Sequence, residues 1–231
     1  MQLHTREWGT GDRTALLVHG IMSDSRTWRR VGPALAERGY RVLAVDLRGH
    51  GRSPRGEYTP RDFADDLVDT LPPGADVIIG HSLGGLALSL AVERLRPLRA
   101  VYSDPAWSSP DPEQPLDPET FASGKNVTRE HIARSNPRWD PADVDVEVAT
   151  LADWDADTSY FLDGRPLTGF VPDRPAVPSL VQLAEPSFLV GAADVTRLRA
   201  SGFEVRTVAG AGHTIHRDDF DGFMKSLDGW I

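Results

Sequence analysis

Short apolar runs that alternate with helical segments are the feature that most restricts the fold of this 231-residue chain. Buried parallel strands are short, rich in β-branched residues and bounded by Gly, Asp or Pro. The alternation therefore predicts an α/β fold with a mostly parallel sheet flanked by helices. We expect strands at residues 14–18, 41–46, 76–80, 99–103, 187–191 and 203–208, an edge strand within 2–8, and helices at 27–38, 59–71 and 83–95.

The alternation is interrupted between about residues 105 and 186. This stretch is rich in proline and acidic residues, and Asp117-Pro118 and Asp140-Pro141 have the pattern of helix starts. A long irregular loop is the alternative, but loops of such length are uncommon in compact domains. We predict a core of residues 1–105 and 186–231, with an inserted, mostly helical cap over 106–185.

Charge is concentrated in the same stretch. Thirteen acidic and four basic residues lie between Asp104 and Asp157, so this segment alone carries the chain's net charge of −9. The segment either forms a solvated face or disfavours polyanionic substrates, and its charge argues against nucleic acid and anionic membranes as partners. The polar first residues are unlike a secretory signal, and no apolar stretch is long enough for a membrane span. We expect a cytoplasmic protein that is a monomer or homodimer.

The motif Gly80-His81-Ser82-Leu83-Gly84 carries the strongest chemical signal. It is a G-x-S-x-G sequence directly after a predicted strand and directly before a predicted helix. In such a turn the serine is strained and its hydroxyl is exposed above the sheet, near the free N–H groups of the helix start. The motif predicts Ser82 as a nucleophile; an incidental serine in a glycine-rich turn is the alternative.

A serine hydroxyl needs an adjacent base, and a carboxylate must orient that base. His213 follows the last predicted strand and is the expected base, since histidine titrates near neutral pH. Asp194 follows the predicted strand 187–191 and is the expected acid, which gives the chain order Ser82, Asp194, His213. Asp104, directly after the predicted strand 99–103, is the alternative acid.

The remaining histidines have structural interpretations. We expect the side chain of His81 to point away from the site, that of His216 to face elsewhere, and that of His19 to brace the loop that follows it. His213, His216 and Asp218 are spaced like a metal cluster, but no further ligand has matching spacing. The chain has no cysteine, which removes disulfides and thiolate ligands. We predict no metal and no cofactor.

These motifs resemble those of the α/β-hydrolases, in their cap-bearing, esterase- and lipase-like branch. The resemblance covers the core but not residues 106–185, and it implies that the backbone N–H groups of Ile21 and Leu83 form an oxyanion hole. The loop at 46–53 we interpret as structural, with Arg48 paired to Asp46. The similar segments are Leu17-Val18-His19-Gly20-Ile21, the D-x-R-G-x-G-x-S loop at 46–53, the G-x-x-D at 191–194 and the G-x-G-H at 210–213.

The resemblance implies a serine hydrolase that cleaves a small, mostly apolar carboxylic ester or lactone through an acyl-enzyme on Ser82. Two alternatives share the fold: a hydrolase of C–C bonds of the meta-cleavage-product type, and a non-catalytic small-molecule receptor. Epoxide hydrolases of this family are disfavoured because they need Asp at position 82. Trp107, Trp139 and Trp154 either line an apolar substrate pocket or anchor the insertion to the core.

Overall fold

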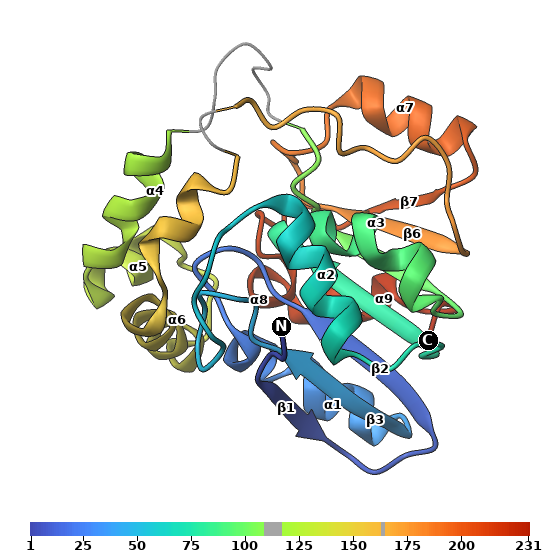
Figure 1. Ribbon diagram of the computed structural model, residues 1–231, viewed down its shortest axis with the longest axis horizontal. Coiled ribbons are helices and arrows are strands. Elements are labelled where there is room, and N and C mark those ends of the chain that lie inside the picture. The colour runs from blue at the N-terminus through green and yellow to red at the C-terminus, as the bar shows by residue number, and fades with distance from the viewer. Residues whose placement is uncertain (109–116, 163–164) are drawn as a thin grey trace.

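A single sheet organises the computed structural model, which describes residues 1–108, 117–162 and 165–231. Within these residues seven strands lie in the order β1-β3-β2-β4-β5-β6-β7, with β1 antiparallel to β3 and all other neighbours parallel. The predicted α/β class, a mostly parallel sheet flanked by helices, is confirmed (Figure 1). The strands are β1 (Thr5–Trp8), β2 (Arg13–Val18), β3 (Tyr40–Val45), β4 (Val77–His81), β5 (Ala100–Ser103), β6 (Ser179–Leu183) and β7 (Glu204–Thr207).

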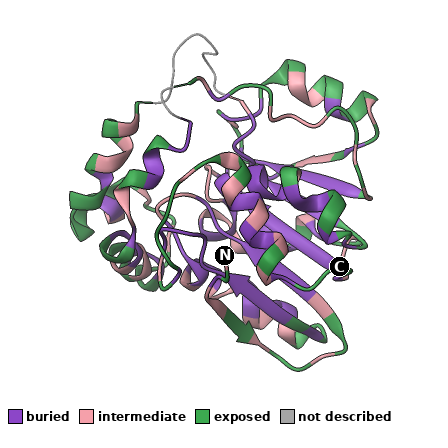
Figure 2. Ribbon diagram, viewed as in Figure 1, coloured by how far each residue is buried: buried purple, intermediate pink, exposed green. Residues whose placement is uncertain are grey.

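Helices cover both faces of the sheet. Alternate residues of β2 enter two different apolar clusters: Leu16 and Val18 belong to one with residues of α2, α3 and α7, and Ala15 and Leu17 to another with residues of α1, α8 and α9. Figure 2 shows the resulting buried sheet between half-exposed helices. The core helices are η1 (Ser25–Trp28), α1 (Val31–Glu37), α2 (Pro60–Thr70), α3 (Leu83–Leu95), α7 (Ala192–Ala200), α8 (Ile215–Asp218) and α9 (Phe220–Ser226).

The insertion contributes its own helices between β5 and β6. They pack on one another around a small apolar cluster of Ile132, Val144, Leu151 and Trp154. Two of them start as the sequence indicates: Asp117 and Asp140 each precede a proline, and their carboxylates accept the N–H groups of Glu119 and Ala142. The inserted helices are α4 (Pro118–Ser123), η2 (Gly124–Asn126), α5 (Arg129–Ser135), α6 (Pro141–Asp153) and η3 (Ala156–Tyr160).

The strand expected at 187–191 is wrong. The sheet is continued instead by β6, whose five residues are all buried and pair with β5. Residues 187–191 form a turn because the Ser187 hydroxyl accepts the N–H groups of Leu189 and Val190. The sheet therefore resumes at Ser179, before the boundary at residue 186 that we expected.

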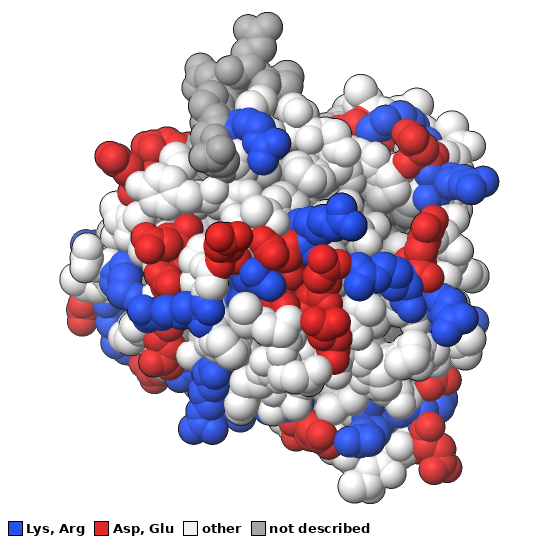
Figure 3. All heavy atoms as spheres, viewed as in Figure 1, with Lys and Arg blue, Asp and Glu red and all other residues white. Residues whose placement is uncertain are grey.

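Ion pairs join the acidic insertion to the core. Arg26 and Arg29, which follow β2, bind Asp153 and Asp143 of α6 at 2.6 Å each, and other acids of the segment remain exposed. The view in Figure 3 shows basic and acidic atoms interspersed, with no large patch of one sign on that face. Acidic residues 111 and 113 lie outside the described residues. No helix in the described part of the chain is both long and apolar enough to cross a membrane.

Candidate functional site

Ser82 occupies the sharp turn between β4 and α3. Its φ of 52° and ψ of −119° are unusual for a residue with a side chain. The turn needs glycine on both sides, since a Cβ at Gly80 would lie 2.6 Å from the carbonyl oxygen of Gly84, and one at Gly84 would lie 2.4 Å from that of Val18. The Ser82 N–H donates to the Ser103 carbonyl at 3.1 Å, which ties the turn to the end of β5.

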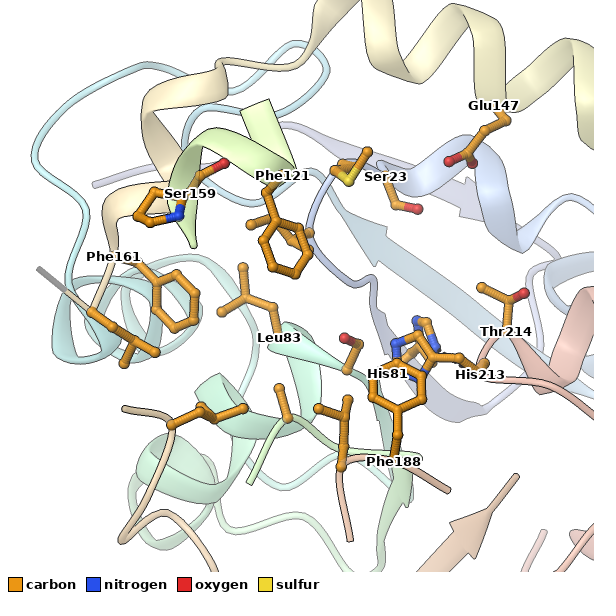
Figure 4. Close-up of a pocket in the computed structure, with 18 residues that line it drawn as sticks. Ser23, His81, Leu83, Phe121, Glu147, Ser159, Phe161, Phe188, His213 and Thr214 are labelled. Carbon is orange, nitrogen blue, oxygen red and sulfur yellow. Dashed lines mark hydrogen bonds between the residues drawn. The ribbon is translucent and has the colours of Figure 1, made fainter. Parts of the chain in front are cut away.

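A cavity of about 220 Å³ opens above Ser82 at the carboxyl ends of the strands. Its wall is mostly apolar and combines residues from the core with residues from the insertion, as Figure 4 shows. Open parallel sheets bind their ligands at this edge, so the cavity is the candidate active site. Its described lining residues are Ile21, Met22, Ser23, His81, Ser82, Leu83, Ala106, Pro118, Phe121, Glu147, Ser159, Phe161, Leu162, Leu167, Phe188, Leu189, His213 and Thr214.

His213 lines this cavity and is oriented by a buried carboxylate. Its Nδ1 lies 2.7 Å from Oδ2 of Asp104, whose side chain is 0 % exposed. Asp104 directly follows β5, and its Oδ1 also accepts the Ala184 N–H at 3.2 Å. With Nδ1 bonded to the carboxylate, Nε2 is the ring nitrogen that remains to exchange a proton with a nucleophile.

The expected pairing of His213 with Asp194 is therefore not what the structure contains. Asp194 lies in the first turn of α7, where its carboxylate accepts bonds from Ser108 at 3.1 Å and Arg197 at 3.2 Å. The turn at 187–191 lies between β6 and α7, so Asp194 does not directly follow the end of a strand. The alternative acid, Asp104, has the contact that we assigned to Asp194.

Ile21 and Leu83, whose N–H groups are predicted to form an oxyanion hole, both line the cavity together with Ser82. Leu83 begins α3, so its N–H has no acceptor within the helix. His19 braces the loop that carries Ile21: its Nε2 accepts the Leu47 N–H at 2.9 Å, and its Nδ1 lies 2.7 Å from the Gly20 carbonyl oxygen. The structural interpretation of His19 is confirmed.

Two further histidines surround the base. Contrary to expectation, His81 lies at the cavity wall; its Nε2 lies 2.9 Å from the His213 carbonyl oxygen, and the two rings are 4.7 Å apart. His216 faces away and stacks on Trp28 at 4.4 Å. Burial, reinforced by the neighbouring histidines, lowers the pKa of His81 well below its usual value, and burial also lowers that of His216. Both rings are therefore neutral near pH 7 and add no charge beside His213.

The three tryptophans predicted as pocket residues do not line the cavity. Trp107 is buried in the core against Tyr102, with ring centroids 4.9 Å apart. The Trp154 indole N–H donates to Thr158 Oγ1 at 2.6 Å inside the insertion. Trp139 donates to Asp218 at 3.1 Å, which connects the insertion to α8. Of the three, Trp139 has the contact that the anchoring alternative describes, whereas Trp107 packs in the core and Trp154 within the insertion.

Phenylalanines form the aromatic wall instead. Phe121 and Phe161 come from the insertion, and Phe188, which is 51 % exposed, lies with its ring 5.0 Å from that of His213 (Figure 4). Sequence reasoning missed these residues and Glu147, because nothing in their local pattern distinguishes a cavity-lining residue from an anchoring or exposed one. Only the packing of the insertion on the core identifies them.

The loop at 46–53 is structural, but its pairing differs from the expectation. Asp46 accepts the N–H groups of Ser25 and Arg52 at 2.8 and 2.9 Å, and Arg48 binds Asp66 of α2 at 2.6 Å. Asp46 thus holds the loop itself, while Arg48 fastens it to α2. Within the described ranges, no group of three His, Asp or Glu side chains is arranged to hold a metal ion.

Comparison with known proteins gives one family. The profile of the alpha/beta hydrolase family matches residues 15–225. An epoxide hydrolase of Caballeronia sordidicola is 37 % identical over 110 residues, which are 44 % of this chain and 33 % of that protein. The match thus spans about a third of that curated relative's length.

Solved structures of the same fold cover the whole chain. The N-formylmaleamic acid deformylase of Pseudomonas putida has a TM-score of 0.80 and 24 % identity, with 98 % of this chain and 95 % of that chain covered. An esterase from Exiguobacterium antarcticum has a TM-score of 0.77 and 14 % identity, with 99 % and 94 % covered. At these identities the likeness establishes the fold alone.

Proposed function

The chain belongs to the alpha/beta hydrolase family, and from this premise we propose that it is a serine hydrolase of small, mostly apolar carboxylic esters or lactones. The proposed triad is Ser82 as nucleophile, His213 as base and Asp104 as the acid that orients the base. The observation that carries the proposal is the 2.7 Å contact between His213 and the buried Asp104, in the cavity that also contains Ser82.

In the proposed reaction, Ser82 Oγ attacks the ester carbonyl carbon while its proton passes to Nε2 of His213. Asp104 keeps the His213 proton on Nδ1 and stabilises the imidazolium that forms. The N–H groups of Ile21 and Leu83 stabilise the oxyanion, and such a donor contributes on the order of 2.7–4 kcal/mol to the rate. His213 then protonates the leaving alcohol oxygen, and water cleaves the acyl-enzyme with His213 again as base.

The cavity wall supports a small apolar acyl group. Leu83, Leu162 and Leu167 line it together with Phe121 and Phe161. These side chains offer no hydrogen bonds, so they favour hydrocarbon surface in the substrate. A serine at position 82 also favours acyl transfer over epoxide opening, which the family performs with an aspartate at that position.

The test is the intact mass of the protein after treatment with a fluorophosphonate, which phosphonylates an activated serine. We expect one adduct on the wild type and none on Ser82→Ala. Ser89→Ala is the matched control, because Ser89 lies on the same helix, outside the described cavity wall, and bonds only to the Leu86 carbonyl oxygen. It should label like the wild type. An adduct that persists in Ser82→Ala, or none on the folded wild type, would refute the proposal.

A further inference from the structure

One carboxylate interrupts the apolar wall of the cavity. Glu147, on α6 of the insertion, is the one Asp, Glu, Lys or Arg among the lining residues that the structure describes. Its side chain is 16 % exposed. The mechanism proposed above gives it no part, although a partly buried charge in an apolar cavity has a large effect on what can bind there.

The cation that pairs with Glu147 is Arg217, which lies outside the described cavity wall. Oε2 of Glu147 accepts from Nη1 of Arg217 at 2.6 Å, and Arg217 is only 2 % exposed. Arg217 also donates to Ser23 Oγ at 3.3 Å and stacks over the Trp139 ring at 4.5 Å. One arginine bond uses only part of the acceptor capacity of a carboxylate. The ion pair is thus fixed from behind, with the carboxylate toward the substrate.

Another polar side chain of the cavity wall also favours substrate groups that donate hydrogen bonds. Thr214 also lines the cavity, and its hydroxyl donates to Asp218 at 3.3 Å, so toward the cavity it can only accept. Figure 4 shows Glu147, Ser23, Thr214 and Phe188 on the side of His213, whereas Phe121, Phe161 and Ser159 lie on the opposite side. Among the described lining residues, the one carboxylate therefore lies at the His213 end of the cavity.

The position of the base decides which part of an ester occupies each end. A general acid must reach the oxygen that it protonates, so the leaving alcohol departs on the side of His213. Glu147 lies on that side as well (Figure 4). The acyl chain then occupies the opposite end, against Phe121 and Phe161.

We propose that Glu147 is a specificity-determining residue, which selects a leaving alcohol bearing a hydrogen-bond donor, ammonium or hydroxyl, and rejects one bearing a carboxylate. This inference rests on the proposed function. A donor held by a carboxylate in a low-dielectric site makes a charge-assisted bond, which is stronger than a neutral one. A second carboxylate at the same place meets like-charge repulsion.

The test uses butyrate esters that share one acyl group and differ in the alcohol. The 2-(dimethylammonio)ethyl ester carries a cationic donor, and the 3-methylbutyl ester is its neutral isostere. The 2-hydroxyethyl ester compared with the propyl ester separates a neutral donor from charge, and 3-butyryloxypropionate supplies a carboxylate. For the wild type we expect kcat/KM about tenfold higher for the cationic ester than for its isostere, and lowest for the carboxylate.

Two variants assign the preference to one residue. Glu147→Gln keeps a carbonyl oxygen for Arg217 and should bring the ratio of kcat/KM for the cationic ester to that for the 3-methylbutyl ester from about ten to about one. Asp145→Asn is the control, because it removes the same charge from the exposed side of α6, where Asp145 pairs with Arg129. It should retain the wild-type preference. Thermal melting checks that both variants are folded.

The outcomes separate this inference from the proposed function. Equal kcat/KM values for the isosteric esters in the wild type, or equal losses in Glu147→Gln and Asp145→Asn, would overturn the role of Glu147 alone. The wild-type comparison keeps this test decisive even where a variant does not fold. Absence of turnover for every ester, together with absence of a fluorophosphonate adduct on Ser82, would overturn both.

Discussion

Replacing Asp104 by Asn tests the carboxylate that orients the proposed base. An Asn at this position can still accept the Ala184 N–H through its oxygen, but it then presents an amide N–H to Nδ1 of His213. That nitrogen must become the acceptor, so the imidazole proton moves to Nε2. The nitrogen that has to take the Ser82 proton is then already protonated, and the base has the wrong tautomer.

The expected loss follows from this change of tautomer. An isosteric amide for the triad carboxylate lowers kcat by about 10⁴, which corresponds to about 5.4 kcal/mol of transition-state stabilisation. Asp194→Asn is the matched control. The Asp194 carboxylate is 25 % exposed and contacts Ser108 and Arg197 rather than His213. Such an exposed pair contributes at most about 1 kcal/mol to stability, and we expect kcat within about twofold of the wild type.

The assay is hydrolysis of 4-nitrophenyl butyrate together with the rate of fluorophosphonate labelling, with circular dichroism as the check of folding. The double variant Asp104→Asn, His213→Ala should lose little more than His213→Ala alone, because residues that act as a unit are non-additive. If Asp194→Asn lost a thousandfold while Asp104→Asn kept most of its activity, the contact between His213 and Asp104 would have no catalytic role.

Two predictions concern stability. Gly84→Ala should lower the free energy of unfolding, measured by urea denaturation, by at least about 3 kcal/mol, because its Cβ would meet the Val18 carbonyl oxygen at 2.4 Å. Gly191→Ala is the control, because open space surrounds that position, and it should cost under about 0.5 kcal/mol. Equal costs would contradict the reasoning. Burial lowers the pKa of His50 to about 3, so below about pH 6.5 the unfolded chain binds a proton that the folded chain does not. Stability should fall from pH 7 to pH 5, by about 2 kcal/mol for this group, and His50→Asn should lose that much less; an unchanged pH dependence would refute the assignment.

The sequence was informative where local backbone chemistry decides the structure. The turn at Ser82 needs glycines at 80 and 84, because neighbouring backbone leaves no room for a side chain. The helix starts at Thr59 and Asp140 are visible because each residue directly precedes a proline and its side-chain oxygen accepts a backbone N–H of the first helical turn. Such features depend on a few adjacent residues and can be recognised without knowledge of the fold.

Tertiary contacts decide which segment forms the strand beside β5. Residues 187–191 form a more apolar run than β6, whose Ser179 and Gln182 are polar. Nε2 of the buried Gln182 side chain donates to the Phe223 carbonyl oxygen at 3.3 Å, a partner 41 residues away. Hydrophobic pattern alone therefore selected the wrong segment, and the expected contact of His213 with Asp194 rather than Asp104 followed from it.

Local sequence patterns also could not identify the residues that line the cavity. Trp107 and Phe161 have similar apolar character and both lie in the predicted insertion, yet one fills the core and the other lines the cavity. The difference arises from how the inserted helices pack on the loop after β2. That packing joins residues more than 100 positions apart, such as Arg29 and Asp143.

The ion pairs between the insertion and the core limit how this protein could be re-engineered. Exchanging the segment between β5 and β6 for that of a relative is an attractive route to new specificity, since it supplies much of the cavity wall. Arg26, Arg29 and Arg217 would then lose Asp153, Asp143 and Glu147, and Arg217 would be left as a buried, uncompensated cation. A successful chimera must therefore also exchange residues 26, 29 and 217 when the inserted helices are exchanged, so that no arginine loses its acidic partner.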